Sequence, residues 1–306
     1  HLGPGALGAL AIPDEGILCP FTTPLAFATE AVMNGTTLLL GTAVAGRRAG
    51  DAGTHVLETT RGEIHADHVV NAAGLASDEI DRLFGHASFT VTPRRGELLV
   101  YDKLARPLVR HVLLPVPTAH TKGVLVSPTV FGNVVLGPTA DDIEDKHATA
   151  STPTGLARLV AHGKRLVPAL AAEEVTAIYV GLRAATEHSD YQLFVHPEER
   201  YVCVGGIRST GLSASMAIAE QVVDGLRDGG LELLRHKDFR TVRMPNLGEA
   251  FLRPYADRAL VAADPDYGRI VCHCERTTRG EILAACRAPI PARSLDGLRR
   301  RTRAGF

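Results

Sequence analysis

The sequence predicts a mixed α/β (α+β) fold, in which helices alternate with strands and one long stretch is all strand and turn. The 306 residues include 30 Gly, 18 Pro and no Trp, a composition that favours strands and turns over a helical bundle. Hydrophobic residues make up 45% and charged residues 22%, which is typical of a chain that buries a sizeable core. At about 150 residues per domain, this length allows two domains.

The first third of the chain predicts two helices separated by short strands. Residues 24–34 suit a helix, because Pro24 fits its first turn and Gly35 its end. Strands are expected over 36–40, 55–60 and within 65–71, the last ending in the small residues Ala72, Ala73 and Gly74. Ser77 is expected to cap a second helix, with Asp78 and Glu79 in the first turn, where acids favour the helix dipole.

Residues 89–140 predict an antiparallel sheet, because short apolar strands are separated there by Gly and Pro turns. Thr152-Pro153 starts a helix that runs to about Leu166. Strands follow over 175–183, 191–196 and 200–206, and a Gly-rich turn then leads into a helix beginning near Ser213. Residues 231–270 are expected to be an irregular linker, and a small separate unit starts near 271.

The charge balance gives no sign of a nucleic-acid partner. Lys and Arg total 33 against 34 Asp and Glu, a net charge of −1, whereas nucleic-acid binding usually needs a basic excess. The most basic run, GLRRRTR at 297–303, is typical of a solvated helix face.

The cysteine count indicates a reducing compartment. The five cysteines are an odd number without the spacing of a disulfide framework: Cys19, Cys203, Cys272, Cys274 and Cys286. No apolar run approaches the roughly 18 residues of a membrane span, and no signal peptide opens the chain. We expect a cytoplasmic protein, with peripheral attachment to the inner face of the membrane left open. The chain also opens without an initiator Met or a strand pattern, so we expect a fragment.

A strand that ends in Gly205-Gly206 and is followed by Gly211 and a helix forms a glycine corner. Such a turn directs backbone N–H groups and the positive end of a helix at an anion or an electron-rich ring. Taken alone, a strand–Gly–helix corner is more often a matter of packing.

Six stretches in a fixed order indicate the protein family more strongly than this corner alone. They are GILCP…LAFATEAVMNG, VVNAAGLASDEI, TPRRGELLVYDK, KGVLVSPTVFGNVVLGPTADDIEDK, GLRAAT and GGIRSTGLSASMAIAE, and they span roughly residues 10–228. In this order they resemble FAD-dependent oxidoreductases of the D-amino-acid-oxidase-like superfamily. The branch they resemble contains anaerobic glycerol-3-phosphate dehydrogenase and L-2-hydroxyglutarate oxidase.

The resemblance implies a Rossmann-like FAD domain over residues 1–230, interleaved with a substrate sheet at about 86–200. The family's first βαβ unit, with its Gly-rich pyrophosphate turn, is missing from this sequence. The flavin ring would lie against the corner Gly206, Ile207, Arg208, Ser209, Thr210, Gly211 and Leu212. The small corner Ala72, Ala73 and Gly74 would line the passage of the nucleotide, and the strand backbone at Val44 would meet the adenine.

Three basic residues are candidates for binding an anionic substrate. The resemblance assigns the arginine matching Arg183 to the substrate's carboxylate or phosphate, and a guanidinium suits either; the alternative is an ion pair with Glu187 or Asp190. Arg208 would face flavin or substrate, or tether the corner. Lys122 would lie near the same opening, or in a solvated turn. No general base stands out among 13 His.

The pair Cys272-x-Cys274 is too close for a sound disulfide and suits two thiolates on one metal centre. The segment VCHCERTTRGEILAAC followed by LDGLRRRTRAGF resembles the start of a bacterioferritin-associated-ferredoxin-like [2Fe–2S] domain. Such a cluster needs four thiolates, of which residues 271–306 supply two, so we expect a C-terminal truncation as well. Cys286 suits a buried position on a helix. A zinc half-site with His273, or incidental loop cysteines, are the alternatives.

The interpretation is an FAD-dependent dehydrogenase that oxidises a small anionic alcohol, such as glycerol 3-phosphate or a 2-hydroxy acid, by hydride transfer to FAD. A quinone or a partner protein is the expected electron acceptor, a hypothesis motivated only by the cysteine pair. The alternatives are an amine- or amino-acid-oxidising flavoprotein of the same superfamily, and a non-catalytic flavoprotein-like subunit.

Overall fold

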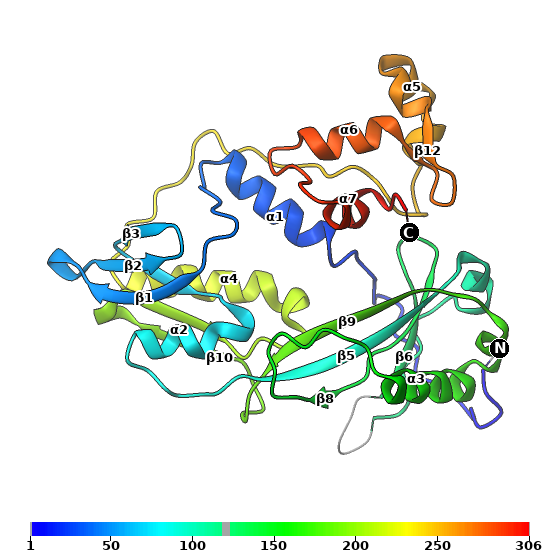
Figure 1. Cartoon of the computed structure of the whole chain (residues 1–306), viewed down its shortest axis with the longest axis horizontal. Coiled ribbons are helices and arrows are strands. Elements are labelled where there is room, and N and C mark those ends of the chain that lie inside the picture. Colours follow the sequence, from blue (N-terminus) through cyan, green and yellow to red (C-terminus); the bar gives the residue numbers. More distant parts are fainter. Residues whose placement is uncertain (1, 118–122, 306) are drawn as a thin grey trace.

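Three groups of elements follow one another across the molecule (Figure 1). A small α/β portion carries β1–β4, α2, α4, β10 and β11, a long twisted sheet carries β5–β9 with α3, and a C-terminal group carries α5–α7 with β12 and β13. The computed structural model describes residues 2–117 and 123–305. The mixed α/β prediction is confirmed.

Helix α1 (Thr22–Met33), close to the expected range, comes before the first group in the chain and lies beside α7 (Figure 1). An antiparallel sheet follows, with strands β1 (Val44–Ala49), β2 (His55–Thr59) and β3 (Gly62–Ala66) in that order. The strand expected over 36–40 is wrong: within the described part of the chain these residues join no sheet, and Leu38, Leu39 and Leu40 are exposed. A short apolar run cannot by itself distinguish a strand from a loop.

A second small sheet forms the centre of this group. Its strands are β4 (Val69–Asn71), β10 (Gln192–His196) and β11 (Tyr201–Gly205), in the order β10-β11-β4. Strand β11 runs parallel to β4 and antiparallel to β10. Its buried side chains Val69, Tyr201 and Cys203 pack with Phe84, Phe89, Val91 and Ala184 in one apolar cluster.

Helices α2 (Ser77–Leu83) and α4 (Gly211–Asp228) pack against strand β11. The prediction that Ser77 caps α2 is wrong, because a 3₁₀ turn over Gly74–Ala76 runs into the helix. Ser77 therefore already has helical dihedrals, φ −62° and ψ −35°, whereas a capping residue is normally extended. Asp78 and Glu79 do lie in the first turn.

The long sheet confirms the antiparallel arrangement expected after residue 89. Its strands are β5 (Thr92–Tyr101), β6 (Leu125–Pro128), β7 (Val134–Gly137), β8 (Asp141–Asp142) and β9 (Val175–Ala185). The order is β6-β7-β5-β8, and β9 pairs with β5 along its length. Helix α3 (Pro153–Leu166) begins as expected, with the Thr152 hydroxyl accepting a hydrogen bond from Gly155 N at 3.1 Å.

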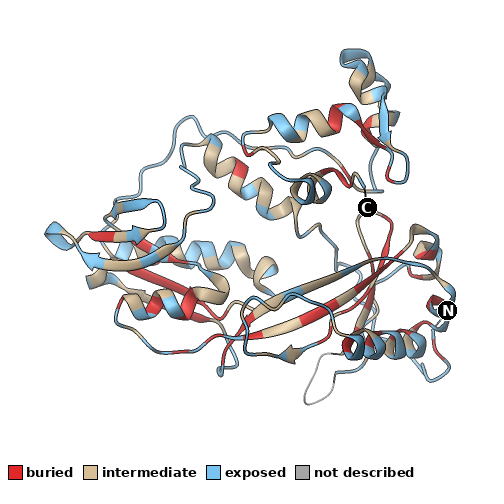
Figure 2. Ribbon diagram, in the orientation of Figure 1, coloured by how far each residue is buried: buried red, intermediate tan, exposed pale blue. Residues whose placement is uncertain are grey.

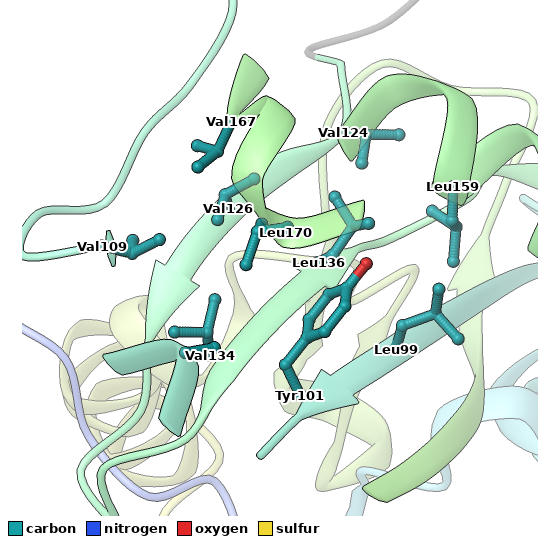
Figure 3. Close-up of a cluster of buried hydrophobic side chains, with 11 residues drawn as sticks. Leu99, Tyr101, Val109, Val124, Val126, Val134, Leu136, Leu159, Val167 and Leu170 are labelled. Carbon is teal, nitrogen blue, oxygen red and sulfur yellow. The ribbon is translucent and has the colours of Figure 1, made fainter. Parts of the chain in front are cut away.

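The two faces of this sheet differ in chemistry. One face supplies Leu99, Tyr101 and Leu136 to a core that α3 covers with Leu159 (Figure 3). The opposite face carries Arg94, Gly96 and Leu98 of β5, whose cross-strand partners on β9 are Arg183, Gly181 and Tyr179. Because successive side chains of a strand alternate between faces, these residues share one surface.

The C-terminal group consists of α5 (Arg258–Ala263), β12 (Ile270–Cys272), β13 (Thr277–Thr278), α6 (Arg279–Arg287) and α7 (Leu295–Thr302). Helix α5 lies within the segment expected to be an irregular linker. The capping box at the start of α6, between Thr278 and Glu281, is present. Further 3₁₀ turns span Asp51–Gly53, Lys103–Leu108, Pro168–Ala172, Pro197–Glu199, Pro254–Ala256 and Pro265–Gly268. None of the described helices has the length and apolarity to cross a membrane.

Candidate functional site

Two glycine-containing corners lie at one edge of the small sheet. Ala72, Ala73 and Gly74 follow β4, and the glycine corner begins at the end of β11, at Gly205. Since β4 and β11 are parallel, with Val69 opposite Tyr201, their carboxyl ends meet at the same edge. This is the edge at which open α/β sheets bind ligands. The structure therefore brings together the two corners that the sequence separates by about 130 residues.

The glycine corner is shaped by contacts that leave no room for side chains. A Cβ on Gly205 would lie 2.3 Å from the ring of Phe89, and one on Gly211 would lie 2.3 Å from Ile207 Cγ2. Gly206 has φ +61°, in the left-handed region that favours glycine. A Cβ there would also meet Thr186 Cγ2 at 3.2 Å, which places the end of β9 beside this corner.

Hydrogen bonds from a neighbouring loop hold the exposed part of the corner. The Arg208 guanidinium donates to Ser189 O, and the hydroxyls of Tyr191 and Thr210 are hydrogen-bonded to each other. Of the two roles considered for Arg208, tethering is the one that these contacts show. Sequence reasoning missed Tyr191, although its position just before β10, the antiparallel neighbour of β11, is a signal that could have found it.

Helix α4 starts directly after this corner, at Gly211 rather than near Ser213. Its N-cap residue is Thr210, and no side chain of the described residues caps the helix. The first N–H groups of a helix lack intrahelical partners and carry partial positive charge. Ser209 and Thr210 are exposed, and Ile207 and Leu212 are partly buried. The corner can therefore present backbone donors to an anion or to the polar edge of a ring.

Arg183 lies on β9, three residues before the Thr186 side chain that reaches the corner. Its guanidinium donates two hydrogen bonds to Thr139 O, both at 3.3 Å. Among the described residues it forms no ion pair, and the expected alternative with Glu187 or Asp190 is wrong. Burial, and secondarily the charge of Arg94, lower the pKa of Arg183. This cation is partly withdrawn from water, and within residues 2–117 and 123–305 its hydrogen-bond partner is a neutral carbonyl alone.

Two acids on neighbouring segments have partners other than Arg183. Asp142 takes a bidentate pair from Arg94, at 2.6 and 3.0 Å, and Glu187 accepts from Thr90 N. A carboxylate or phosphate from outside the described residues could therefore take the remaining donors of Arg183 in bidentate fashion.

Two other candidates lie away from this arrangement. Val44 opens β1 in the first small sheet, opposite Thr59. A hollow of about 480 Å³ lies along the same sheet, but it is lined at the far end of β1, in the connection to β2 and on β3, for example by Arg48, Thr54 and His65. Lys122 lies outside the described residues.

Of the two neighbouring cysteines, Cys272 ends β12 and Cys274 lies on the turn that leads to β13. Cys272 is partly buried, Cys274 is exposed, and Cys272 Sγ accepts a hydrogen bond from Gly305 N at 3.4 Å. Cys286 is exposed on α6, so the expectation of a buried position there is wrong. Cys272, His273 and Cys274 do not converge as a three-ligand set in the described chain.

Comparison with known proteins points to the same family as the ordered sequence motifs. Residues 1–225 match the family described as FAD dependent oxidoreductase, DAO. A glycerol 3-phosphate dehydrogenase of Caloramator mitchellensis is 35% identical over 302 residues, which cover 98% of this chain and 62% of that protein. A glycerol 3-phosphate oxidase of Mycoplasma pneumoniae is 29% identical over 229 residues, 73% of this chain and 60% of the relative. The chain thus spans about 60% of the length of these curated relatives.

Solved structures agree with these sequence comparisons. The dithionite-reduced L-alpha-glycerophosphate oxidase from Mycoplasma pneumoniae with FAD bound aligns with a TM-score of 0.63 and 29% identity, over 69% of this chain and 56% of that one. A glycine oxidase from Bacillus cereus aligns with a TM-score of 0.59 at 19% identity, a likeness of fold alone. The family match, the ordered motifs and the paired corners agree: the chain belongs to the DAO family of FAD-dependent oxidoreductases.

Proposed function

We propose that this chain forms the flavin-facing and substrate-facing part of an enzyme that oxidises glycerol 3-phosphate. The observation that carries the proposal is Arg183, a partly buried cation with no ion pair among the described residues, close to the glycine corner. A phosphate monoester offers two or three acceptor oxygens to such a fork. The two glycerol-3-phosphate relatives, at 35% and 29% identity, support this substrate class.

The residues of the corner fit an FAD. The cofactor, when bound, would supply the acceptor for a hydride from the carbinol carbon. The uncapped start of α4 and the backbone of Gly206–Leu212 would hold the ring, and Ala72, Ala73 and Gly74 would border the nucleotide at the same sheet edge. The chain at Val44 is proposed to border the adenine.

The chain's own residues then have separate tasks. Arg183 binds and orients the substrate's phosphate, while the contacts of Arg208 and Tyr191 hold the corner in place. Lys122 is proposed as a second, weaker contact to the anion. Rigid positioning of this kind lowers the barrier by fixing the reacting atoms in advance. We assign no general base.

A second candidate is oxidation of a small amine or amino acid, because a guanidinium binds carboxylate as well as phosphate. Anaerobic bleaching of the bound flavin separates the two. The protein that carries this chain, with all flanking residues that its gene encodes, is mixed with glycerol 3-phosphate, a 2-hydroxy acid or glycine. Glycerol 3-phosphate should bleach the flavin at the lowest concentration. Faster bleaching by glycine would favour the second candidate, and bleaching by none would favour a non-catalytic subunit.

We propose further that Cys272 and Cys274 supply two of the four thiolates of a [2Fe–2S] cluster. They fit this role in part: they share one turn, and an N–H···S hydrogen bond to Cys272 is of the kind that tunes such clusters. A quinone or partner protein as electron acceptor and a cytoplasmic location are parts of the same proposal. Iron and labile-sulfide analysis tests it, and zinc without iron would contradict it.

A further inference from the structure

A cluster of two imidazoles and one carboxylate lies at the opposite end of β11 from the glycine corner. The ligand atoms of His86, His196 and Glu199 all lie within 4.8 Å of one another, and the three side chains are partly buried. Strand β11 separates the cluster from the corner by about 13 Å, at about 3.3 Å per residue. From this juxtaposition we propose a zinc-class divalent metal site that is independent of the flavin site and of the proposed function.

The donor set selects the class of metal. Neutral imidazole nitrogen with one carboxylate oxygen suits Zn²⁺ and similar transition metals, whereas Mg²⁺ and Ca²⁺ prefer oxygen alone. Two bonds of about 2.0–2.1 Å at a tetrahedral angle hold their donor atoms about 3.3 Å apart. His86 Nε2 and Glu199 Oε2 are 3.2 Å apart, so this pair already has the required spacing.

The surrounding structure holds each ligand in place by a different element. His86 follows α2, and its backbone N donates to Asp81 O at 3.2 Å. His196 ends β10 opposite Tyr201 in the strand ladder. Glu199 belongs to the 3₁₀ turn between the two strands, and its backbone carbonyl accepts from His55 Nε2 at 2.8 Å. A bound ion would therefore link the end of α2 to the β10–β11 turn.

The ring of His196 has to turn away from that of His86 to join the pair. It stacks on His86 with centroids 3.9 Å apart and an interplanar angle of 14°. Stacked rings do not direct both lone pairs at one point, so binding should splay them. Three protein ligands would leave a fourth position for water, as in open zinc sites.

The test uses the full 306-residue chain with Cys272→Ser and Cys274→Ser, which removes the competing thiols. Zinc affinity is measured by competition with a chromophoric chelator. His86→Phe and His196→Phe keep an aromatic ring for stacking, and Glu199→Gln keeps the shape of the side chain. Loss of an outer hydrogen-bond partner alone typically costs about 10–100-fold in metal affinity, so each of these changes should cost at least about tenfold. His65→Phe, at an exposed His beside Glu63, is the matched control and should leave the affinity unchanged.

X-ray absorption of the zinc-loaded chain that lacks Cys272 and Cys274 gives a second readout. We expect nitrogen and oxygen neighbours only, at about 2.0–2.1 Å, with two imidazoles. Absence of zinc binding in the chain that lacks Cys272 and Cys274 would overturn the site. So would an affinity that stays unchanged in all three ligand variants while circular dichroism shows them folded.

Discussion

Two arginines, Arg94 and Arg183, are cross-strand neighbours, and they differ in how their charges are compensated. Arg94 and Arg183 lie directly opposite each other on β5 and β9, and like charges at such positions are unfavourable. Asp142 neutralises Arg94, whereas in the described part of the chain Arg183 donates to the carbonyl of Thr139 and to no carboxylate. An arriving anion would therefore relieve an existing repulsion as well as form new hydrogen bonds.

Replacing Arg183 should affect the charged substrate specifically. A hydrogen bond to a charged group contributes about 1.5–3 kcal/mol, so Arg183→Ala should lower kcat/KM for glycerol 3-phosphate by about 10- to 150-fold. Arg183→Lys, which keeps the charge but loses the fork, should lower it less. Steady-state kinetics on the full gene product check this.

Glycerol, which lacks the phosphate, is the control substrate for the same variants. Its slow oxidation should change little in Arg183→Ala, so that the preference for the phosphate ester collapses. An equal loss on both substrates would show that Arg183 supports the fold or the cofactor instead.

His55 is a buried residue whose protonation state the structure fixes. A carbonyl only accepts and a guanidinium only donates, so Nε2 must donate to Glu199 O while Nδ1 accepts from Arg47 at 3.1 Å. The imidazole is therefore neutral. Burial, with the charge of Arg47 as a further cause, lowers the pKa of His55 below 6.5.

This lowered pKa predicts a loss of stability in acid. As the pH falls below about 6.5, the unfolded chain takes up a proton that folded His55 refuses, so the free energy of unfolding decreases. One such group contributes a slope of up to about 1.4 kcal/mol per pH unit. Urea titrations between pH 5 and 8 should therefore show a shallower pH dependence in His55→Gln, and an identical dependence would contradict the assignment.

At the scale of elements, packing and backbone conformation shape the glycine corner. Phe89 fills the space where a side chain at 205 would lie, and Gly206 needs its left-handed backbone. The corner is therefore rigid on one side, where Phe89 and Thr186 pack, while Ser209 and Thr210 are exposed on the other. Figure 2 shows α4, which continues from this corner, largely exposed.

Overpacking this corner should destabilise it. Gly205→Ala places a methyl group 2.3 Å from the Phe89 ring, and such clashes typically cost about 1–3 kcal/mol. Adding Phe89→Leu should recover part of the loss, as chemical denaturation would show. Gly181→Ala on β9, where nothing lies within 4 Å of an added Cβ, should change the free energy of unfolding by less than about 0.5 kcal/mol. If all three variants proved equally stable, the packing account would fail.

Local sequence signals predicted most elements whose cause is local. Thr152-Pro153 located the start of α3, because an N-cap and a first-turn proline act within a few residues. The small residues of the corners after β4 and β11 were also predicted correctly, because a turn that needs small residues is likewise a local signal. The apolar run at 36–40 was misassigned, because whether it becomes a strand depends on a neighbour to pair with. The cluster of His86, His196 and Glu199 was missed, since His86, which follows α2, meets the turn between β10 and β11 only through the packing of α2 on β11.

At the scale of the whole molecule, ion pairs attach the C-terminal group to the long sheet. Glu275, next to Cys274, accepts from Lys103 Nζ at 2.7 Å and lies 3.5 Å from Arg303. Arg303 also contacts the Phe131 ring, 4.4 Å from its centroid. Arg300 lies over the ring of Phe21 at the start of α1. The cysteine turn is therefore held against the sheet that carries Arg183.

Removing Glu275 should loosen this attachment. The change removes the carboxylate that faces the buried guanidinium of Arg303. Breaking a buried ion pair costs about 3–5 kcal/mol. The cost should be smaller here, because Lys103, the other partner of Glu275, is partly exposed. Hydrogen exchange in Glu275→Ala should rise over 270–305 and stay unchanged in α3. Asp296→Ala, which removes an exposed pair with Arg300, is the control and should alter exchange little. Unchanged protection of 270–305 would show that apolar contacts alone hold this group.

The sequence could not predict this attachment. Lys103 and Glu275 are 172 residues apart, and nothing local to either indicates the other. The same holds for Arg183 and Thr139, which meet through the pairing of β9 with β5. Composition and motif order indicated the family, but long-range partners follow from strand order and register.

The most direct measurement is the visible absorption spectrum of the complete gene product, purified without oxygen and without added cofactor. If the paired corners at the ends of β4 and β11 hold a flavin, the protein should carry flavin absorption bands and release FAD when it is denatured. A colourless protein that takes up no FAD when it is offered would contradict the account.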